Sequence, residues 1–256
     1  MLLTVDIGNT NVVIGCYRDK RLYKSHRFDT RKNLKANEWR KYFVKQFNDH
    51  MGAAPREIKQ ICVSSVVPKI NKKFSTLCER YFRTAPFFVS HQCKLGMAIA
   101  VEHPGKVGVD RLVNTAAAYA KYKTDLIVVD MGTATTIDVV IKPGVFIGGI
   151  IFPGPALSLQ SLYDKASQLP LVPIKKTESI IGKNTAACIQ SGIYHGYIGM
   201  FEGVIAKMKT ELKKEMTVVA TGGLSVLFAK ATQTINHFEA DLTIEGLRMI
   251  HEWNRP

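Results

Sequence analysis

The 256-residue sequence has no long apolar run and few cysteines. Its richest apolar stretch, residues 145–152, is far shorter than the about 20 residues that cross a bilayer, and it carries two glycines. Charge appears early, at Asp6, so the opening residues lack the pattern of a signal peptide. With 46% hydrophobic and 22% charged residues, the composition is that of an ordinary globular protein, and membrane-spanning, collagen-like and disordered classes are excluded.

The 5 cysteines are odd in number, and no two have Cys-x-x-Cys spacing, so neither a disulfide framework nor a zinc site is indicated. A reducing cytoplasm is therefore the expected location. Three familiar motifs are also missing: the Walker A loop, a Gly-x-Gly-x-x-Gly turn between a strand and a helix, and Gly-x-Ser-x-Gly. P-loop, Rossmann dinucleotide and serine-hydrolase chemistry are not favoured.

Acidic residues are few, which leaves a net charge of +14. Residues 18–83 contain 18 Lys or Arg against 6 Asp or Glu, so +12 of the excess lies there. Such a surface favours anionic ligands, but it is equally consistent with a solvated basic face. No zinc-finger spacing or aromatic RNA-binding pattern accompanies the charge, so a nucleic-acid partner is not expected.

Apolar runs and turn residues alternate in a way that predicts an α/β fold with two similar halves and mixed sheets. Each half opens with three strands joined by tight turns, an antiparallel meander. The expected strands are residues 2–6, 12–17, 22–28, 58–66, 87–89, 126–130, 136–141, 145–152 and 216–220. The expected helices are residues 37–51, 68–82, 111–122, 156–163, 183–213, 224–231 and 243–252.

The two halves share a sequence repeat. Val5-Asp6-Ile7-Gly8 and Val129-Asp130-Met131-Gly132 match at an offset of 124 residues, each between two expected strands. This repeat predicts an internal duplication, with one domain over residues 1–115 and a second over residues 116–256.

Both repeated turns have a composition suited to phosphate. Glycine lets the backbone approach an anion closely, and Asn and Thr side chains add hydrogen-bond donors. The Asp at the end of each preceding strand can hold a hydrated cation that neutralises phosphate charge. Each turn alone could be an ordinary hairpin connection, but the matched pair indicates two loops that hold one polyphosphate.

The motif series along the chain resembles that of the type III pantothenate kinase family. The matching segments are Asp6-Ile7-Gly8-Asn9-Thr10-Asn11, Gly108-Val109-Asp110-Arg111, Asp130-Met131-Gly132-Thr133-Ala134-Thr135-Thr136, Gly148-Gly149-x-x-x-Pro153-Gly154, Gly182-Lys183-Asn184-Thr185 and Gly222-Gly223. Their order and spacing match over nearly the whole chain.

The resemblance implies a fold and an activity. The fold would be two duplicated actin-like ATPase domains, of the ribonuclease H-like type, with a nucleotide cleft between them. The activity would be ATP-dependent phosphorylation of pantothenate to 4′-phosphopantothenate, the first step of coenzyme A biosynthesis, by a cytoplasmic homodimer. The family requires Mg²⁺ and a monovalent cation, K⁺ or NH₄⁺.

The resemblance also implies roles for single residues. Asp110 would be the general base on the pantothenate hydroxyl, and Asp130 would bind the monovalent cation. Asp6 would hold Mg²⁺ through water. ATP would contact Asp6, Ile7, Gly8, Asn9, Thr10, Asn11, Val12, Val13, Thr133, Gly222 and Gly223. Pantothenate would contact Val101, Gly108, Val109, Asp110, Arg111 and Thr185.

Simpler readings of three of these sites stay open from the residues alone. Asp110 stands where a helix N-cap is expected. Arg111, whose guanidinium suits the pantothenate carboxylate, can equally form a surface ion pair. The Gly222-Gly223 pair can be only a turn. One position departs from the family: Val101 replaces the usual Tyr, which predicts weaker pantothenate binding or a reshaped pocket.

The expected helix after Thr185 contains four glycines, each of which lowers helix propensity by about 1 kcal/mol relative to Ala. Their spacing puts Gly192, Gly196, Gly199 and Gly203 on one face. Such a face predicts close helix packing, either within the core or across a two-fold axis, and the family resemblance favours the homodimer.

Two alternative functions remain from the sequence. One is a regulatory, non-catalytic homologue similar to the Bvg accessory factor branch of the family, which would bind nucleic acid or a protein partner. The other is a kinase for a different small hydroxyl substrate, suggested by Val101.

Overall fold

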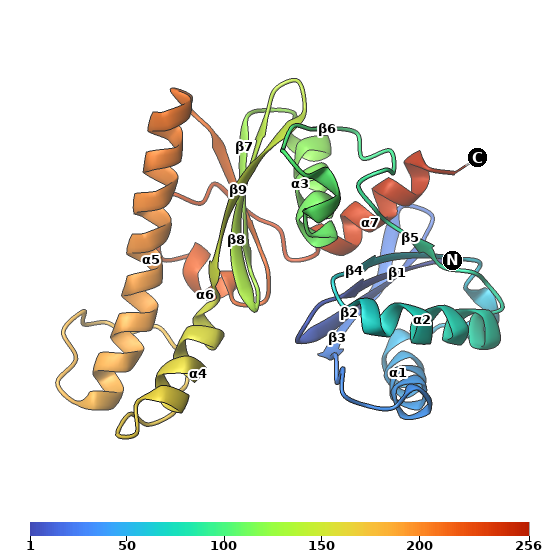
Figure 1. Cartoon of the computed structure of the whole chain (residues 1–256), viewed down its shortest axis with the longest axis horizontal. Coiled ribbons are helices and arrows are strands. Elements are labelled where there is room, and N and C mark those ends of the chain that lie inside the picture. The colour runs from blue at the N-terminus through green and yellow to red at the C-terminus, as the bar shows by residue number, and fades with distance from the viewer. Residues whose placement is uncertain (256) are drawn as a thin grey trace. The chain divides into compact units, whose positions relative to one another are not determined.

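The computed structural model describes residues 1–255. The chain forms two compact units (Figure 1). The first contains residues 1–120 and the C-terminal segment that starts at Asp241, and the second contains residues 121–240. Each unit is a mixed sheet covered by helices, which confirms the expected α/β class with two mixed sheets.

The first unit is built on a sheet of strand order β3-β2-β1-β4-β5. Its strands are β1 (Leu2–Ile7), β2 (Asn11–Arg18), β3 (Arg21–Asp29), β4 (Gln60–Ser65) and β5 (Phe87–Phe88). Its helices are α1 (Ala36–Met51), η1 (Pro55–Glu57), α2 (Pro68–Leu77), η2 (Cys78–Phe82), η3 (Pro104–Lys106), α3 (Val109–Tyr122) and α7 (Leu242–Trp253).

Successive side chains of β1 point to opposite faces of the sheet, and different helices cover the two faces. Leu3, Val5 and Ile7 point to one side and join the core made by the aromatic side chains of α1 and α2. The other face receives α7: a Cβ added to Gly15 would lie 3.0 Å from Ile244 Cδ1. Glycine in the middle of β2 therefore lets α7 pack closely on the sheet.

The second unit is built on a sheet of strand order β11-β10-β7-β8-β9-β6, in which β6 is Ala98–Ile99. Its strands are β7 (Leu126–Met131), β8 (Ala134–Ile141), β9 (Val145–Pro153), β10 (Thr217–Thr221) and β11 (His237–Phe238), and its helices are α4 (Pro155–Lys165), α5 (Thr185–Leu212) and α6 (Ser225–Ala229). Phe201 of α5 and Phe228 of α6 are buried with the inward side chains of β7 and β8 in one core.

The internal duplication extends to strand length and register. The first three strands have 6, 8 and 9 residues in both units. Antiparallel and parallel pairs follow in the same order. The second strand carries a register shift after Cys16 in one unit and after Val139 in the other. A repeated irregularity of this kind is strong support for duplication, because β-bulges are specific local features.

The division of the chain differs from the expected break between residues 115 and 116. The break falls at Ala120 and Lys121, and the last helix belongs to the first unit. The reason is packing: α7 contacts β1, β2 and β4, and a Cβ at Gly246 would lie 2.8 Å from the carbonyl oxygen of Val113 in α3. Among residues 1–255, no helix is both long and apolar enough to cross a bilayer.

Candidate functional site

The first Asp-Gly loop joins β1 to β2. Asp6 is the penultimate residue of β1, and Gly8, Asn9 and Thr10 form the turn before Asn11 opens β2. The amide of Gly8 donates to the carbonyl oxygen of Asn11 at 2.9 Å. Asn9 and Thr10 are exposed, so their side chains and the loop backbone are accessible to a ligand.

Thr30, which follows β3, braces this loop. Its hydroxyl donates to the carbonyl oxygen of Gly8 at 2.7 Å, and its amide donates to the carbonyl oxygen of Thr10, also at 2.7 Å. The indole N–H of the fully buried Trp39 donates to the carbonyl oxygen of Thr30 at 2.8 Å. The first loop is therefore connected to the core of its unit through one threonine.

The second Asp-Gly loop joins β7 to β8 and contains only Gly132 and Thr133. Asp130 is the penultimate residue of β7 and pairs with Thr221 of β10. Gly222, the next residue, has a φ of +98°, and a Cβ there would lie 2.5 Å from Asp130 Oδ1. Only glycine accepts both this φ and this close approach, so the sequence needs a glycine at this place.

A glycine also supports the second loop from the far side. The amide of Gly154 donates to the carbonyl oxygen of Thr133 at 2.9 Å. A Cβ at Gly154 would lie 2.1 Å from the carbonyl oxygen of Gly132. The second unit therefore brings Asp130, the Gly132-Thr133 loop and Gly222 together at the carboxyl end of β7.

Asp110 lies in the first turn of α3, in a segment that follows a 20-residue connection from β5. The helix begins at Val109, so Asp110 is not its N-cap, and the N-cap reading is wrong. The amide of Arg111 donates to Asp110 Oδ1 at 2.8 Å. A Cβ at Gly108 would lie 2.6 Å from the same oxygen, so Gly108 leaves the space that the carboxylate fills.

The surroundings of Asp110 change its acidity. Burial raises the pKa of the carboxyl above its ordinary value of 3.8, because desolvation disfavours the charged form. The hydrogen bond from the Arg111 amide and the charge of the Arg111 guanidinium lower the same pKa and only partly offset the burial. A carboxylate with a raised pKa beside a glycine-containing loop is a candidate general base.

The remaining predicted residues fall into three settings. Ile7 and Val12 are fully buried in the core of the first unit, so only their backbone can meet a ligand, whereas Val13 is partly exposed. Val101 is partly exposed in the connection before α3. Thr185 is the first residue of α5, whose N-cap Asn184 accepts from the amide of Ala187 at 2.9 Å.

Two polar residues, Thr30 and Asp138, were not predicted from the sequence. Thr30 is an isolated threonine far from the Gly8 loop along the chain. Asp138, in the middle of β8, is 2% exposed, and a Cβ at Gly149 would lie 2.7 Å from its Oδ1. A lone Asp inside an apolar strand is the sequence feature that marks a buried acid.

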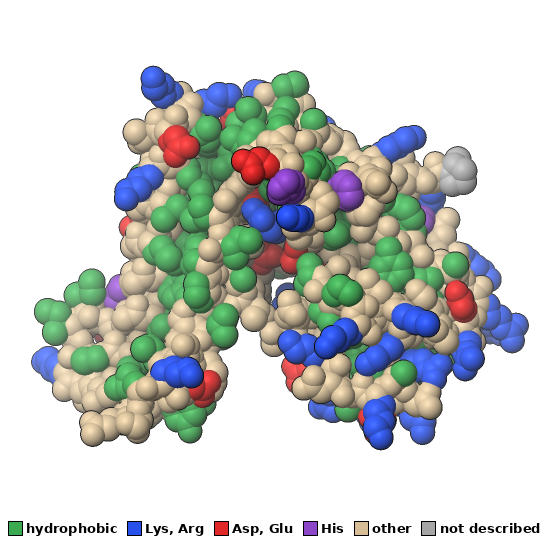
Figure 2. Space-filling model, viewed as in Figure 1, with side chains coloured by type: hydrophobic (Ala, Val, Ile, Leu, Met, Phe, Trp, Pro, Cys, Tyr) green, Lys and Arg blue, Asp and Glu red, His purple; other side chains and the backbone are tan. Residues whose placement is uncertain are grey.

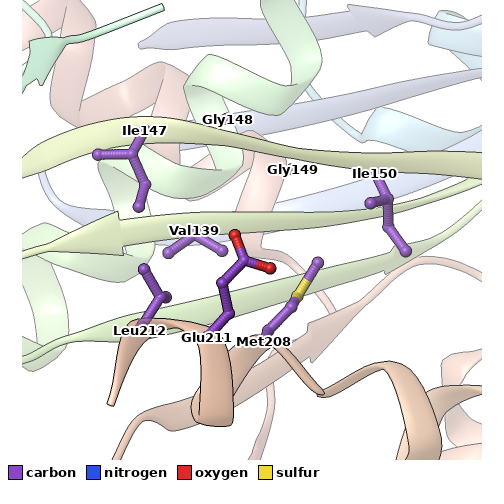
Figure 3. Close-up of a pocket in the computed structure, with 8 residues that line it drawn as sticks. All are labelled: Val139, Ile147, Gly148, Gly149, Ile150, Met208, Glu211 and Leu212. Atoms are coloured by element: carbon purple, nitrogen blue, oxygen red, sulfur yellow. The ribbon is translucent and has the colours of Figure 1, made fainter. Parts of the chain in front are cut away.

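A pocket in the second unit lies away from the Gly132-Thr133 loop. Residues 147–150 of β9 line it with Val139 of β8 and with Met208, Glu211 and Leu212 near the end of α5 (Figure 3). Val139 pairs with Gly148, whereas Ala134, next to the second loop, pairs with Pro153. Five residues of strand separate the two positions, about 17 Å at 3.4 Å per residue. The pocket is therefore separate from the second Asp-Gly loop.

Comparison with known sequences gives a consistent match. The family model described as type III pantothenate kinase matches residues 2–207. Two relatives carrying that name come from Geobacter sp. (strain M21), at 43% identity, and from Anaeromyxobacter sp. (strain Fw109-5), at 42% identity. Each alignment runs over 255 residues and covers 100% of both chains.

Solved structures of low sequence identity share the fold. A Baf family protein from Campylobacter jejuni has a TM-score of 0.60 at 19% identity, with 98% of each chain covered. The ethanolamine utilization protein EutJ from Carboxydothermus hydrogenoformans has a TM-score of 0.58 at 14% identity, covering 97% of this chain and 89% of its own. The expected α/β fold with two mixed sheets is therefore confirmed, and these structures share it over nearly the whole chain.

Proposed function

This chain belongs to the type III pantothenate kinase family, and we propose that it transfers the γ-phosphoryl group of ATP to the hydroxyl of pantothenate, giving 4′-phosphopantothenate in the first step of coenzyme A biosynthesis. The observation that carries the proposal is the full-length match together with both Asp-Gly loops and the Asp110 turn in ordered, glycine-supported conformations. Phosphoryl transfer needs mainly positioning and charge neutralisation, which these parts suit.

Asp110 is the proposed general base. Its carboxylate would accept the proton of the pantothenate hydroxyl as that oxygen attacks phosphorus. The raised pKa makes its carboxylate a stronger proton acceptor than that of an ordinary Asp. Arg111, the next residue, would pair with the carboxylate of pantothenate, and Gly108, Val109 and Val101 would line the acceptor.

The two loops are the proposed ATP site. The backbone and side chains of Gly8, Asn9, Thr10 and Asn11 would bind phosphate oxygens from the first unit, and Thr133 would do so from the second. Gly222 and Gly223 would lie against adenosine. The protein contributes fixed N–H and hydroxyl donors, which need no reorganisation as charge develops.

The family uses ATP with a divalent metal, and the residues fit cations. Asp6 and Asp130 each stand next to the last residue of a central strand, and carboxylate oxygens are ligands that Mg²⁺ prefers. The glycine at position 222 keeps side-chain atoms away from Asp130 Oδ1. Asp6 would hold Mg²⁺ through water and Asp130 a monovalent cation, K⁺ or NH₄⁺. When bound, these cations neutralise the phosphate charge.

A homodimer is part of the proposal. On α5, a Cβ added at Gly192, Gly196, Gly199 or Gly203 would meet no described atom within 4 Å apart from its chain neighbours and the adjacent backbone of its own helix. The glycine face therefore has no partner inside the chain, and a second copy would cover it, with Thr185 near the partner's site. Gly196→Leu should give a monomer in light scattering; a fully dimeric variant would argue against this interface.

The basic segment offers a second candidate function. Figure 2 shows Lys and Arg side chains gathered over the region of α1 and α2 in the first unit. Such a surface would attract nucleic acid through phosphate contacts. We place the protein in the cytoplasm and give the kinase activity preference, because Asp6, Asp110 and Asp130 are all present.

The test is ADP release from ATP, with and without pantothenate and with and without added K⁺ or NH₄⁺. Cation-stimulated release that requires pantothenate is the expected result. Release with another hydroxyl acceptor but not with pantothenate would point to a different substrate, consistent with Val101. Folded protein that releases no ADP and shifts DNA in a salt-dependent way would support the regulatory function instead.

A further inference from the structure

Trp253 and Asn254, near the C-terminus, pack against the segment that precedes Asp110. That segment, residues 91–107, belongs to the 20-residue connection between β5 and α3 and contains only β6 and η3 as regular structure. Most of its side chains are exposed or partly exposed, and Leu95, at 3% exposure, is its buried anchor. A long connection of this kind keeps one conformation only if other parts of the fold hold it.

Asn254, the residue after α7, holds the segment by its backbone. The amide of Lys94 donates to Asn254 Oδ1 at 2.9 Å, and Asn254 Nδ2 donates to the carbonyl oxygen of Lys94 at 2.9 Å. The same Nδ2 donates to the carbonyl oxygen of Ile250 at 2.7 Å, which fixes the side chain on its own helix. The Asn254 side chain therefore accepts one hydrogen bond from the Lys94 backbone and donates one to it, as a paired residue of an adjacent β-strand does.

Trp253 holds the segment two residues further on. A Cβ added at Gly96 would lie 3.2 Å from Cη2 and Cζ3 of the Trp253 ring, so the ring lies against the bare backbone. Gly96 also has a φ of +69°, which L side chains rarely adopt. The turn at Gly96 and the ring of Trp253 form one packed unit.

The far end of the segment is connected to its start. A Cβ at Gly105 would lie 3.2 Å from Cε1 of His91, so the imidazole covers the η3 turn. The amide of Val107 donates to the carbonyl oxygen of Pro104 at 3.2 Å, and Gly108 follows directly. Contacts thus run from the C-terminus through residues 91–107 to the glycine that leaves room for Asp110.

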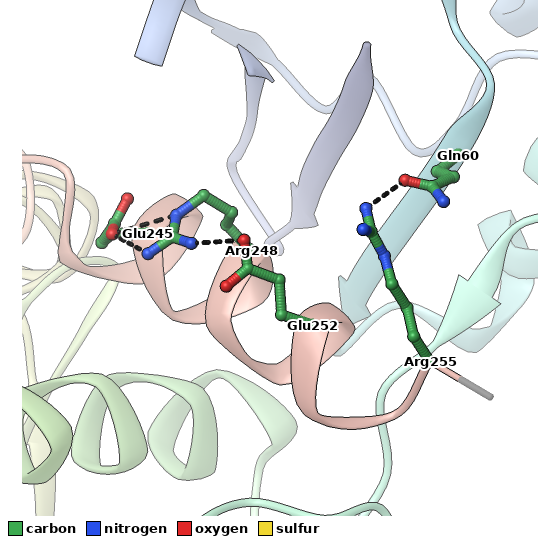
Figure 4. Close-up of polar contacts among 5 residues, drawn as sticks. All are labelled: Gln60, Glu245, Arg248, Glu252 and Arg255. Atoms are coloured by element: carbon green, nitrogen blue, oxygen red, sulfur yellow. Dashed lines mark hydrogen bonds and ion pairs between the residues drawn. The ribbon is translucent and has the colours of Figure 1, made fainter. Parts of the chain in front are cut away.

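The helix that carries this end is itself well fixed. Arg248 is 6% exposed and pairs with Glu245 on one side and with Glu252 on the other, at 2.8 Å from Nη1 to Oε1 (Figure 4). Beyond Asn254, Arg255 bonds Gln60 of β4. The residues that hold the segment therefore project from a rigid support.

We propose that Trp253 and Asn254 are positioning residues that hold residues 91–107 in the conformation needed to bind the phosphoryl acceptor. The inference rests on the proposed function for the identity of that acceptor, pantothenate, and on the contacts above for the ordering itself. Neither residue touches the substrate; each acts through the segment that contains Val101 and ends at Gly108.

The experiment compares Asn254→Ala with the matched control Arg255→Ala, which removes the adjacent contact to β4 but none to the segment. Asn254→Ala should raise the KM for pantothenate about tenfold, from loss of hydrogen bonds that fix the segment, while the KM for ATP changes less than about twofold. Amide hydrogen exchange of a peptide covering residues 91–107 should accelerate in the same variant. Arg255→Ala should match the wild type in all three measurements.

A conservative pair separates positioning from loss of folding. Trp253→Phe should keep the pantothenate KM near the wild-type value, because a ring still covers Gly96, and Trp253→Ala should raise it. The proposal is wrong if exchange in residues 91–107 is unchanged in Asn254→Ala, or if the KM values for ATP and pantothenate rise together. Failure of the wild type to phosphorylate pantothenate would refute the proposed function, while the exchange measurement would still decide whether the C-terminus orders the segment.

Discussion

In the first unit the loop between β1 and β2 has three residues, Gly8, Asn9 and Thr10, whereas the loop between β7 and β8 has only Gly132 and Thr133. The strand pairs on either side keep equivalent registers, so the difference is a single residue confined to the turn. The longer loop exposes two polar side chains. Duplication therefore preserved the sheet and let the turn diverge.

The supports of the two loops also differ. Thr30 in the first unit and Gly154 in the second both donate an amide hydrogen to the loop, at 2.7 and 2.9 Å. The Thr30 hydroxyl also donates a hydrogen bond to the loop. Gly154 has no side chain to do so, and its lack of a Cβ lets its backbone lie close to the loop. The first loop is therefore held by a hydroxyl hydrogen bond that one substitution can remove. The second loop is held by close backbone packing, which any side chain at position 154 would disturb.

The largest expected effect comes from comparing α3, the next α-helix after β5, with α7, the helix that follows β11. α3 carries Asp110 in its first turn, and α7 has Asp241 just before it. Asp110→Asn should lower kcat by about 10²- to 10⁴-fold, the usual contribution of a general base. Asp241→Asn is the matched control and should keep kcat, since Asp241 is exposed. Equal losses in both variants would remove Asp110 from the role of base.

The next effect concerns the close fit at Gly154. The backbone there is extended, with φ −71° and ψ 163°, so alanine is allowed and the whole penalty comes from contact. Gly154→Ala should lower the free energy of unfolding by about 3 kcal/mol, the upper end of the usual overpacking cost. Urea unfolding measures this change. A variant as stable as the wild type would show that the second loop moves easily.

The pH dependence of Asp110 gives a smaller effect with a definite sign. Its folded-state pKa lies above the unfolded one, so the ionised carboxylate destabilises the fold at neutral pH, and this penalty disappears as pH falls through the folded pKa. Asp110→Asn should therefore be more stable than the wild type at pH 7, with the difference vanishing near pH 4. Thermal unfolding across that range checks it. A difference that grows toward low pH would contradict the raised pKa.

The fall of kcat/KM at acidic pH should also reflect the raised pKa of Asp110. Protonation of the base stops catalysis. As pH decreases, kcat/KM should therefore drop with an apparent pKa higher than the ordinary 3.8 of Asp. The profile is measured with pantothenate well below its KM, so that the free enzyme is observed.

Much of the fold follows from local sequence. The apolar runs that flank Gly8 and Gly132 are short and end at turn residues, so strand positions and the duplication are readable. The place of α7 is not readable, because an apolar helix face does not state which sheet it covers. The N-cap interpretation of Asp110 failed for a similar reason: the helix begins at Val109, two residues before the expected start at residue 111, and sequence patterns do not fix a helix boundary that closely.

The site is only partly readable for a different reason. Asp6, Asp130 and Asp110 stand in short motifs with their glycines, and those glycines are explained by close approaches. The contacts of Asn254 to Lys94 span 160 positions of sequence, and Thr30 lies 22 residues from Gly8. Partners at such separations leave no periodic or compositional trace.

The smallest expected effect returns to the first loop. Thr30→Ala removes the hydroxyl bond to Gly8 but keeps the amide bond to Thr10, so it should lower the free energy of unfolding by about 1 kcal/mol, the net value of one hydrogen bond. The KM for ATP should rise modestly, because Gly8 and Asn9 lose one restraint. Thr30→Ser keeps the hydroxyl and is the control. If Thr30→Ala costs as much stability as Gly154→Ala, the two loops are held alike, and the contrast between a directional bond and a close fit is wrong.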